Sequence, residues 1–294
     1  MERGCGVAHA ALGVVNAIAS GGVGAAAALG LWLRACVRRA PGYRGRSYTR
    51  GRLLEVEPRI LGAVDEAVAA WLGAPRLGGL EATVWSSIPL EAGLKGSSAL
   101  VNALLEAMLR LRGHHPPGLV ELARLGVEAA RAAGLTVTGA LDDHLAVSGC
   151  GLYVTDNRRQ RLLRHEPAPG GWRYAAIASA GRLPIARVGR AAYARLRWVE
   201  ESALRLLSLG DYGGAALVNG LVVAPAAGAP PELLVELAGL PGVVAAGMSG
   251  KGPAVYAVAV DEAAASQAAG VLAAGLGAGP LVAPVLPCHH GPNG

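Results

Sequence analysis

The sequence predicts an α+β protein built in two halves. The chain has 294 residues, and 52% of them are hydrophobic, which is enough apolar material for one large core or two ordinary ones. Segments typical of strands and of helices alternate in both halves, and no short repeat divides the chain into equal units. These observations exclude a disordered chain and a solenoid. We expect two domains, residues 1–160 and 161–294.

The N-terminal stretch of residues 4–33 is apolar and contains no Asp, Glu, Lys or Arg. Its length would suffice to span a bilayer. Polar residues and glycines nevertheless divide it into two short apolar runs. The interrupting residues are His9, Asn16, Ser20, Gly21, Gly22 and Gly24. We therefore interpret it as a buried strand, a loop and then a helix. A cleavable signal is not expected, because a single Arg3 precedes an alanine-rich region that runs on too long.

The rest of the first half begins with one strand and two helices. Residues 82–89 are typical of a strand that ends at a proline, and residues 97–113 carry apolar side chains at helical spacing. Ser97 or Ser98 is the expected N-cap of this helix, which Gly113 closes. A second helix is expected over residues 117–134.

The later elements continue the mixed pattern. A β-branched run precedes Gly139, Asp142 and Asp143, which we expect in a loop that leads into a helix. The arginine-rich segment 158–171 predicts an edge hairpin and the crossing into the second half. The elements expected there are strands at 173–179, 254–260 and 280–287, and helices at 193–210, 211–223 and 262–277.

Charge and cysteine content narrow the functional classes. A net charge of +6 would suit an anionic partner, but the arginines are scattered, so we expect a generic basic surface and no nucleic-acid site. The four cysteines lie far apart, without a CxxC pair, at Cys5, Cys36, Cys150 and Cys288. We therefore expect reduced cysteines and a cytoplasmic protein.

Two glycine-rich turns hold the only lysines of the chain, Lys95 and Lys251. In the first turn a strand ends at Pro89 and a helix starts at paired serines, so several backbone N–H groups point into one concavity. Gly93 and Gly96 let a phosphate approach the backbone, and the helix dipole favours an anion. The P-loop pattern is absent, because the lysine precedes the glycine and serines. The turn is either an anion site or simply a well-capped helix start.

The second turn, residues 247–253, makes a nucleotide site more plausible, because a chain of glycines is costly unless the backbone approaches a ligand. Asp142 and Asp143 lie between the two turns in sequence. They are either a surface N-terminal cap or, beside a phosphate, a base with a metal or lysine partner.

These motifs resemble those of a known superfamily. The pattern of Pro89, Gly93, Leu94, Lys95, Ser97, Ser98 and Ala99 looks like the ATP-binding motif of the GHMP kinases, and residues 249–254 resemble their third motif. GLKGSSA, TGALDDHLA and residues 14–31 are similar to one subgroup, the archaeal shikimate kinases. Two residues depart from that subgroup: Gly96 replaces an expected serine, and His144 replaces a small residue in a place where it can reshape the substrate pocket.

The resemblance implies a fold and a reaction. The fold would be the two-domain GHMP kinase fold, with an N-terminal half like the second domain of a ribosomal protein and a ferredoxin-like C-terminal half. ATP would phosphorylate the 3-hydroxyl of shikimate, giving ADP and shikimate 3-phosphate. The rival acceptors are homoserine, mevalonate and pantoate, and a further alternative is a non-catalytic sensor that binds ATP on the same fold.

The resemblance also implies roles for individual residues. The ATP-binding set comprises Pro89, Leu90, Glu91, Ala92, Gly93, Leu94, Lys95, Gly96, Ser97, Ser98, Ala99, Ser249, Gly250 and Gly252. Mg²⁺ would be held by Ser98 and Glu128. Asp142 is the expected base, with Asp143 as the alternative, and Lys95 would neutralise phosphate charge or lower the pKa of the aspartate.

The expected substrate contacts are Asn16, Thr138 and Asp142, together with an arginine that the sequence does not identify. Lys251 is interpreted as a loop residue. Asn102 and Asn219 are expected to be buried hydrogen-bonding groups, and residues 288–290 a solvated tail.

Overall fold

The computed structural model describes residues 3–90, 92–136, 139–167, 169–179, 197–249 and 254–288, without the side chains at 197–199 and 226. It divides into two compact units. Unit 1 comprises residues 1–10, 31–90 and 95–149, and unit 2 comprises residues 11–30, 91–94 and 150–294. The expected boundary between domains after residue 160 stays a prediction.

Two long strands contribute residues to both units. β1 (Gly4–Val15) and β2 (Val23–Arg39) pair with each other. The expected strand and loop are confirmed, but the expected helix after the loop is wrong, because this segment is β2. Its alanines are buried, and the strand pairs with β5 in unit 1 and with β6 in unit 2, so sheet pairing overrides the helix propensity of alanine.

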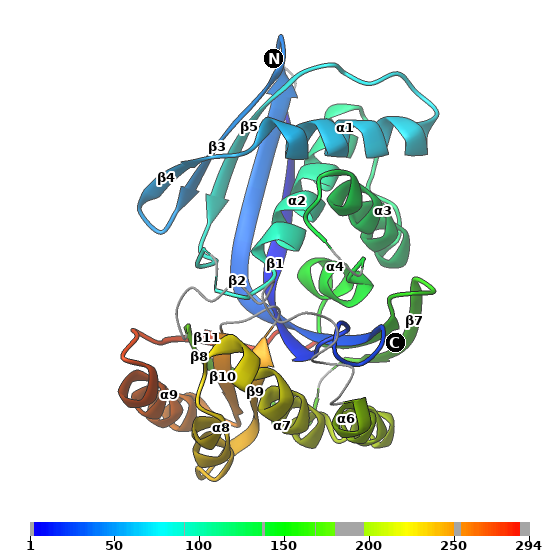
Figure 1. Ribbon diagram of the computed structural model, residues 1–294. Helices are drawn as coiled ribbons and strands as arrows, with labels where there is room; N and C mark the ends of the chain where they lie inside the picture. Colours follow the sequence, from blue (N-terminus) through cyan, green and yellow to red (C-terminus); the bar gives the residue numbers. More distant parts are fainter. Residues whose placement is uncertain are drawn as a thin grey trace. The chain divides into compact units, whose positions relative to one another are not determined.

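Unit 1 places four helices on one face of its sheet (Figure 1). The strands run in the order β4-β3-β5-β2. Alternate residues of β5 are buried, as expected for a sheet with one covered face. The bounds are β3 (Tyr43–Thr49), β4 (Arg52–Glu55), β5 (Leu80–Ser86), α1 (Pro58–Leu72), α2 (Gly96–Leu111), α3 (Leu119–Ala132) and α4 (Leu141–Ser148).

Close contact between β1 and α2 fixes the position of α2 within unit 1. A Cβ atom at Gly4 would lie 1.9 Å from the carbonyl oxygen of Ala107, and one at Gly6 would lie 2.3 Å from that of Ala103. Only glycine permits this approach of strand and helix backbones.

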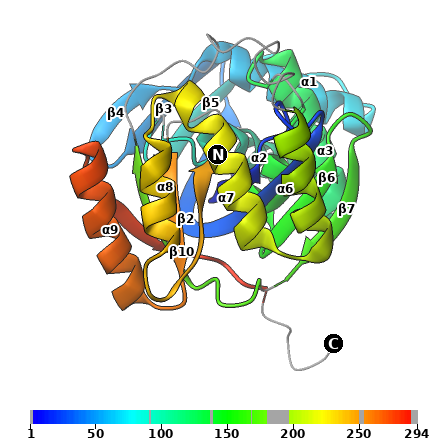
Figure 2. The ribbon, with the colours of Figure 1, turned by 60° about the horizontal axis from the view of Figure 1, so that its bottom comes forward.

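Unit 2 contains an edge hairpin and a second sheet. β6 (Leu152–Asp156) pairs with β2 and with β7 (Arg161–Glu166), which is the edge strand. Of the hairpin expected within residues 158–171, only the second strand, β7, lies in that segment. The second sheet is antiparallel in the order β11-β8-β10-β9, and the helices α9, α8, α7 and α6 lie in a row beside it (Figure 2). The bounds are β8 (Tyr174–Ser179), β9 (Val243–Ser249), β10 (Ala254–Ala259), β11 (Leu281–Pro284), α6 (Arg197–Leu209), α7 (Tyr212–Val223), α8 (Pro231–Ala238) and α9 (Glu262–Leu276), and a short 3₁₀ turn spans Pro225–Ala227.

The expected elements of residues 82–134 and of the second half are present, with ends that differ by a few residues; the expected start of α6 lies outside the described residues. The elements β3, β4, β6, β9, α1 and α8 were not expected from the sequence. In the described part of the chain, no helix is long and apolar enough to cross a bilayer.

The cysteines form two disulfides, so the expectation that they are reduced is wrong. Cys5 is bonded to Cys36 within unit 1, and Cys150 to Cys288 within unit 2. The two cysteines of each disulfide are 31 and 138 residues apart in sequence, respectively, so the local spacing of the cysteines could not predict the pairing.

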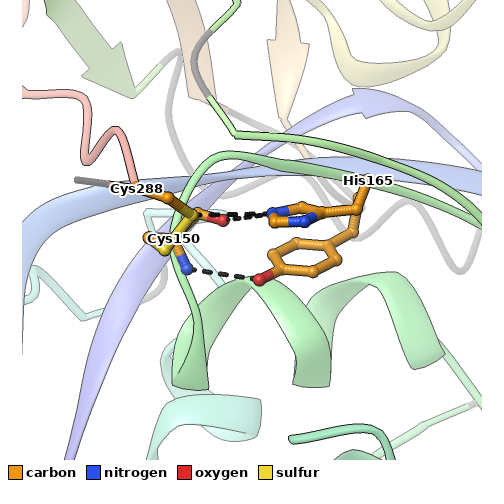
Figure 3. The surroundings of a disulfide bond; sticks show 4 residues. Cys150, His165 and Cys288 are labelled. Carbon is orange, nitrogen blue, oxygen red and sulfur yellow. Dashed lines mark hydrogen bonds between the residues drawn. A yellow bond between two sulfur atoms is a disulfide. The ribbon is translucent and has the colours of Figure 1, made fainter. Parts of the chain in front are cut away.

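The side chain of His165 lies beside the second disulfide, with its Nε2 3.6 Å from Sγ of Cys288 (Figure 3). The ring of His165 stacks on Tyr153 at 4.4 Å, and its Nε2 donates to the carbonyl oxygen of Cys150 at 3.0 Å. Cys288 is therefore anchored and is not part of a solvated tail; His289 and His290 lie outside the described residues.

Candidate active site

The first glycine-rich turn makes a sharp entry into α2. Lys95 is the N-cap of the helix and has a left-handed backbone with φ of 61°, which is uncommon for a residue other than glycine. Gly93 also has a positive φ, of 70°. No side chain caps the helix, so the expected capping by Ser97 or Ser98 is wrong. The first N–H groups of α2 have no intrahelical acceptors, which makes this end of the helix suitable for an anion.

Lys95 forms an ion pair across unit 1. Its Nζ lies 2.7 Å from Oδ1 of Asp143, and the two side chains are only 12% and 15% exposed. Burial alone would lower the pKa of Lys95, but the charges of Asp143 and Asp142 and the hydrogen bond to Asp143 outweigh it, so the pKa lies above its usual value. Lys95 therefore stays protonated, and its positive charge lies beside both carboxylates.

The two adjacent aspartates occupy different environments in the first turn of α4. Asp143 is the ion-pair partner of Lys95, whereas Asp142 is buried at 4% exposure and acts on Lys95 through its charge. The sequence placed both near a lysine but did not show which one pairs with it.

Behind the aspartates, a buried polar cluster joins α2 to α4. Nδ2 of Asn102 donates to the carbonyl oxygen of His144 at 2.9 Å and to Oγ of Ser148 at 2.7 Å. Oδ1 of Asn102 lies 2.6 Å from Nδ1 of His144. Burial lowers the pKa of His144 to about 4, so the ring is neutral near pH 7. Its side chain is fully buried within the helices of unit 1.

The helix α3 packs directly against this cluster. A Cβ atom at Gly126 would lie 2.3 Å from Oδ1 of Asn102 and 2.5 Å from Nδ1 of His144. The expectation that Asn102 is a buried hydrogen-bonding group is confirmed. The contributions of Ser148 and Gly126 were missed, because neither belongs to a recognisable motif.

Within unit 2, the two glycine-rich motifs meet at Ser249. Its hydroxyl donates to the carbonyl oxygen of Gly93 and accepts from the N–H of Gly13, both at 2.8 Å. Ser249 is fully buried, and its hydroxyl is used by these two backbone groups. Its role in phosphate binding stays a prediction, and Gly250, Lys251 and Gly252 lie outside the described residues.

Asn16 shapes the turn between β1 and β2 in unit 2. Its N–H donates to Oδ1 of Asn219 at 2.9 Å, and its own Oδ1 accepts from the N–H of Ile18 at 2.9 Å. Asn219 is buried on α7, as expected. The substrate contact assigned to Asn16 stays a prediction, and Glu91 and Thr138 lie outside the described residues.

The expected metal ligands both belong to unit 1. Ser98 is half-buried in the first turn of α2, and Glu128 is exposed on α3. Among the described residues, no group of three or more His, Cys, Asp or Glu side chains could hold a metal ion.

Known proteins resemble this chain in sequence. The family profile described as the GHMP kinases N terminal domain matches residues 59–151. The shikimate kinase of Aeropyrum pernix is 41% identical over 85% of this chain and 89% of its own length. The chain belongs to the GHMP kinase family. Two further shikimate kinases are similar to this GHMP kinase. That of Thermococcus kodakarensis is 37% identical over 85% of this chain and 90% of its own length. That of Pyrococcus furiosus is 34% identical over 87% of this chain and 91% of its own length.

Solved structures support the fold of this GHMP kinase. Lactococcus lactis galactokinase has a TM-score of 0.73 at 13% identity, covering 98% of this chain and 94% of its own. Cytophaga hutchinsonii homoserine kinase has a TM-score of 0.69 at 18% identity, covering 98% and 96%. The fold is thus the α+β, two-domain fold expected from the sequence.

Proposed function

We propose that this GHMP kinase is a shikimate kinase, which transfers the γ-phosphoryl group of ATP to the 3-hydroxyl of shikimate. The observation that carries the proposal is the similarity to three shikimate kinases at 34–41% identity over at least 85% of the chain. The uncapped start of α2 and the charged Lys95 beside two aspartates suit phosphoryl transfer, which depends on positioning and charge neutralisation.

In the proposed reaction, the backbone N–H groups at the start of α2 hold phosphate oxygens. Asp142 accepts the proton of the 3-hydroxyl while the hydroxyl oxygen forms a bond to the γ-phosphorus. The bond between the γ-phosphorus and the bridging oxygen breaks, and that oxygen leaves with ADP. The charged ammonium of Lys95 would neutralise negative charge beside the aspartates and the phosphates.

Magnesium binding is part of the same proposal. Ser98 is half-buried, and no side chain caps the helix end at which it lies. This fits a magnesium site, because Mg²⁺ usually keeps several waters, binds substrate phosphates and needs few protein ligands. Ser98 and Glu128 would hold the ion, which neutralises charge on the phosphates. Replacing Ser98 with alanine should raise the Mg²⁺ concentration needed for half-maximal activity, and an unaltered dependence would remove Ser98 from the ligand set.

We also propose a cytoplasmic location, since ATP is the phosphate donor. The two disulfides do not exclude that location, because disulfides also occur in intracellular proteins, those of hyperthermophiles among them.

The direct test is a coupled assay of ADP release with shikimate as acceptor, with phosphorus NMR to identify the product. Homoserine, mevalonate and pantoate serve as matched acceptors. Turnover on one of these and none on shikimate would contradict the acceptor but not the kinase. ATP binding without turnover on any acceptor would favour a sensor.

A further inference from the structure

The helix that carries both aspartates is too short to hold its own position. α4 has only 8 residues, and no side chain caps its N-terminus. A helix of this length is unstable in isolation, so contacts with its neighbours must fix it. Asn102, on α2, supplies directional contacts of this kind.

The orientation of the Asn102 amide is determined by its partners. Its NH₂ group must face the carbonyl oxygen of His144, since a carbonyl accepts only. The amide oxygen therefore faces Nδ1 of His144, which must carry the proton. The same NH₂ group reaches Ser148 one turn further along α4. One fully buried side chain thus makes three hydrogen bonds to α4.

These bonds lie on the same side of α2 as the ion pair. Lys95 and Asn102 are seven residues apart, two helical turns, and so share one face of the helix. α4 is therefore attached to α2 at two levels, through Asp143 at Lys95 and through His144 and Ser148 at Asn102.

We infer that Asn102 is a positioning residue for catalysis, which holds α4 on α2 so that Asp143 meets Lys95 and Asp142 faces the reacting hydroxyl. The inference rests on the proposed kinase activity for its catalytic part. Its structural part, that Asn102 sets the Lys95–Asp143 pair, needs no substrate.

The first test observes Lys95 directly. The chain has only two lysines, so lysine-selective ¹⁵N labelling gives two side-chain ammonium signals, and Lys251→Arg assigns them. A buried, ion-paired ammonium exchanges slowly with water and should give a resolved signal. In Asn102→Ala we expect this signal to broaden or disappear. Leu109→Ala, which truncates another fully buried side chain of α2, should keep it.

The second test is kinetic, at a temperature where every variant is folded. Asn102→Ala should lower kcat by about 30-fold or more and leave the KM for ATP within about two-fold, because a small displacement of the base affects the chemical step and not nucleotide binding. Leu109→Ala should keep kcat within about three-fold. If Asn102→Ala does not fold, Ser148→Ala, which removes one of the three hydrogen bonds, takes its place with a smaller effect in the same direction.

The inference is overturned if a folded Asn102→Ala or Ser148→Ala retains both the Lys95 signal and its kcat. It is also overturned if Leu109→Ala loses both to the same extent, since Asn102 would then act through stability alone. If the wild-type protein phosphorylates no acceptor, the proposed function fails, whereas the NMR comparison still decides whether Asn102 sets the ion pair.

Discussion

At the scale of single residues, Asp142 and Asp143 differ in what their loss should do. Asp142→Asn should lower turnover by about 10³-fold or more, with ATP affinity nearly unchanged, because it removes the proposed base. Asp143→Asn should lower the free energy of unfolding by about 3–5 kcal/mol, because it breaks a largely buried ion pair. Measuring kcat and urea unfolding for both variants separates the roles. Near-normal turnover in Asp142→Asn would move the base to Asp143.

Lys95 carries a second residue-scale prediction, which concerns its backbone. Lys95→Ala and Lys95→Gly both remove the ammonium, but only glycine adopts a φ of 61° without strain. Lys95→Gly should therefore be more stable than Lys95→Ala by about 1 kcal/mol. This order is the reverse of that at an ordinary helical position. Equal denaturation midpoints would show that the left-handed conformation is not maintained in solution.

The sequence points to these candidate residues more readily than to their partners. Lys95 and the two aspartates were predicted because each lies in a motif with a chemical purpose. Their pairing was not, because Asp142 and Asp143 are equivalent by spacing and only the fold distinguishes them. Asn102 was expected to be buried, but its partners on α4 lie more than 40 residues away in sequence.

At the scale of elements, periodicity predicted the helices more reliably than the strands. α2, α3 and α9 have apolar faces and glycine ends, and each was predicted close to its observed bounds. β2 was predicted as a helix, because a run of alanines and glycines buried on both faces has no alternation to reveal a strand. Its conformation is set by its partner strands β5 and β6.

The packing of α3 on the Asn102–His144 cluster gives an element-scale prediction. Gly126→Ala would place a methyl group within 2.5 Å of two hydrogen-bonded atoms, so α3 must move away from the cluster. We expect a loss of about 1–3 kcal/mol in the free energy of unfolding. Gly270→Ala is the matched control, since it lies in α9 with open space around it and should be neutral or stabilising by about 0.5–1 kcal/mol. Similar values for both would contradict the close approach of α3.

At the scale of the whole molecule, the cysteines connect segments that the sequence gives no reason to associate. Cys150 follows α4 directly, and Cys288 follows the last strand, β11. Near the second disulfide, the N–H of Gly151 donates to the carbonyl oxygen of Leu286 at 2.7 Å, and the N–H of Cys288 donates to that of Pro167 at 2.8 Å. The C-terminal segment is thus held by backbone bonds as well as by the disulfide.

The two disulfides should differ in their effect on stability. Restricting the unfolded chain stabilises the fold more for longer loops, and the formula for loop entropy gives about 5 kcal/mol for the Cys150–Cys288 loop and about 3.7 kcal/mol for the Cys5–Cys36 loop. The double variant Cys150→Ala/Cys288→Ala should therefore lose more stability in urea than Cys5→Ala/Cys36→Ala. A thiol titration of the unfolded, unreduced protein checks that both disulfides form. We expect no reactive thiol. Four reactive thiols would show that both cysteine pairs are reduced in solution. Reductant should lower the stability of the wild-type protein but leave a variant without cysteines unchanged.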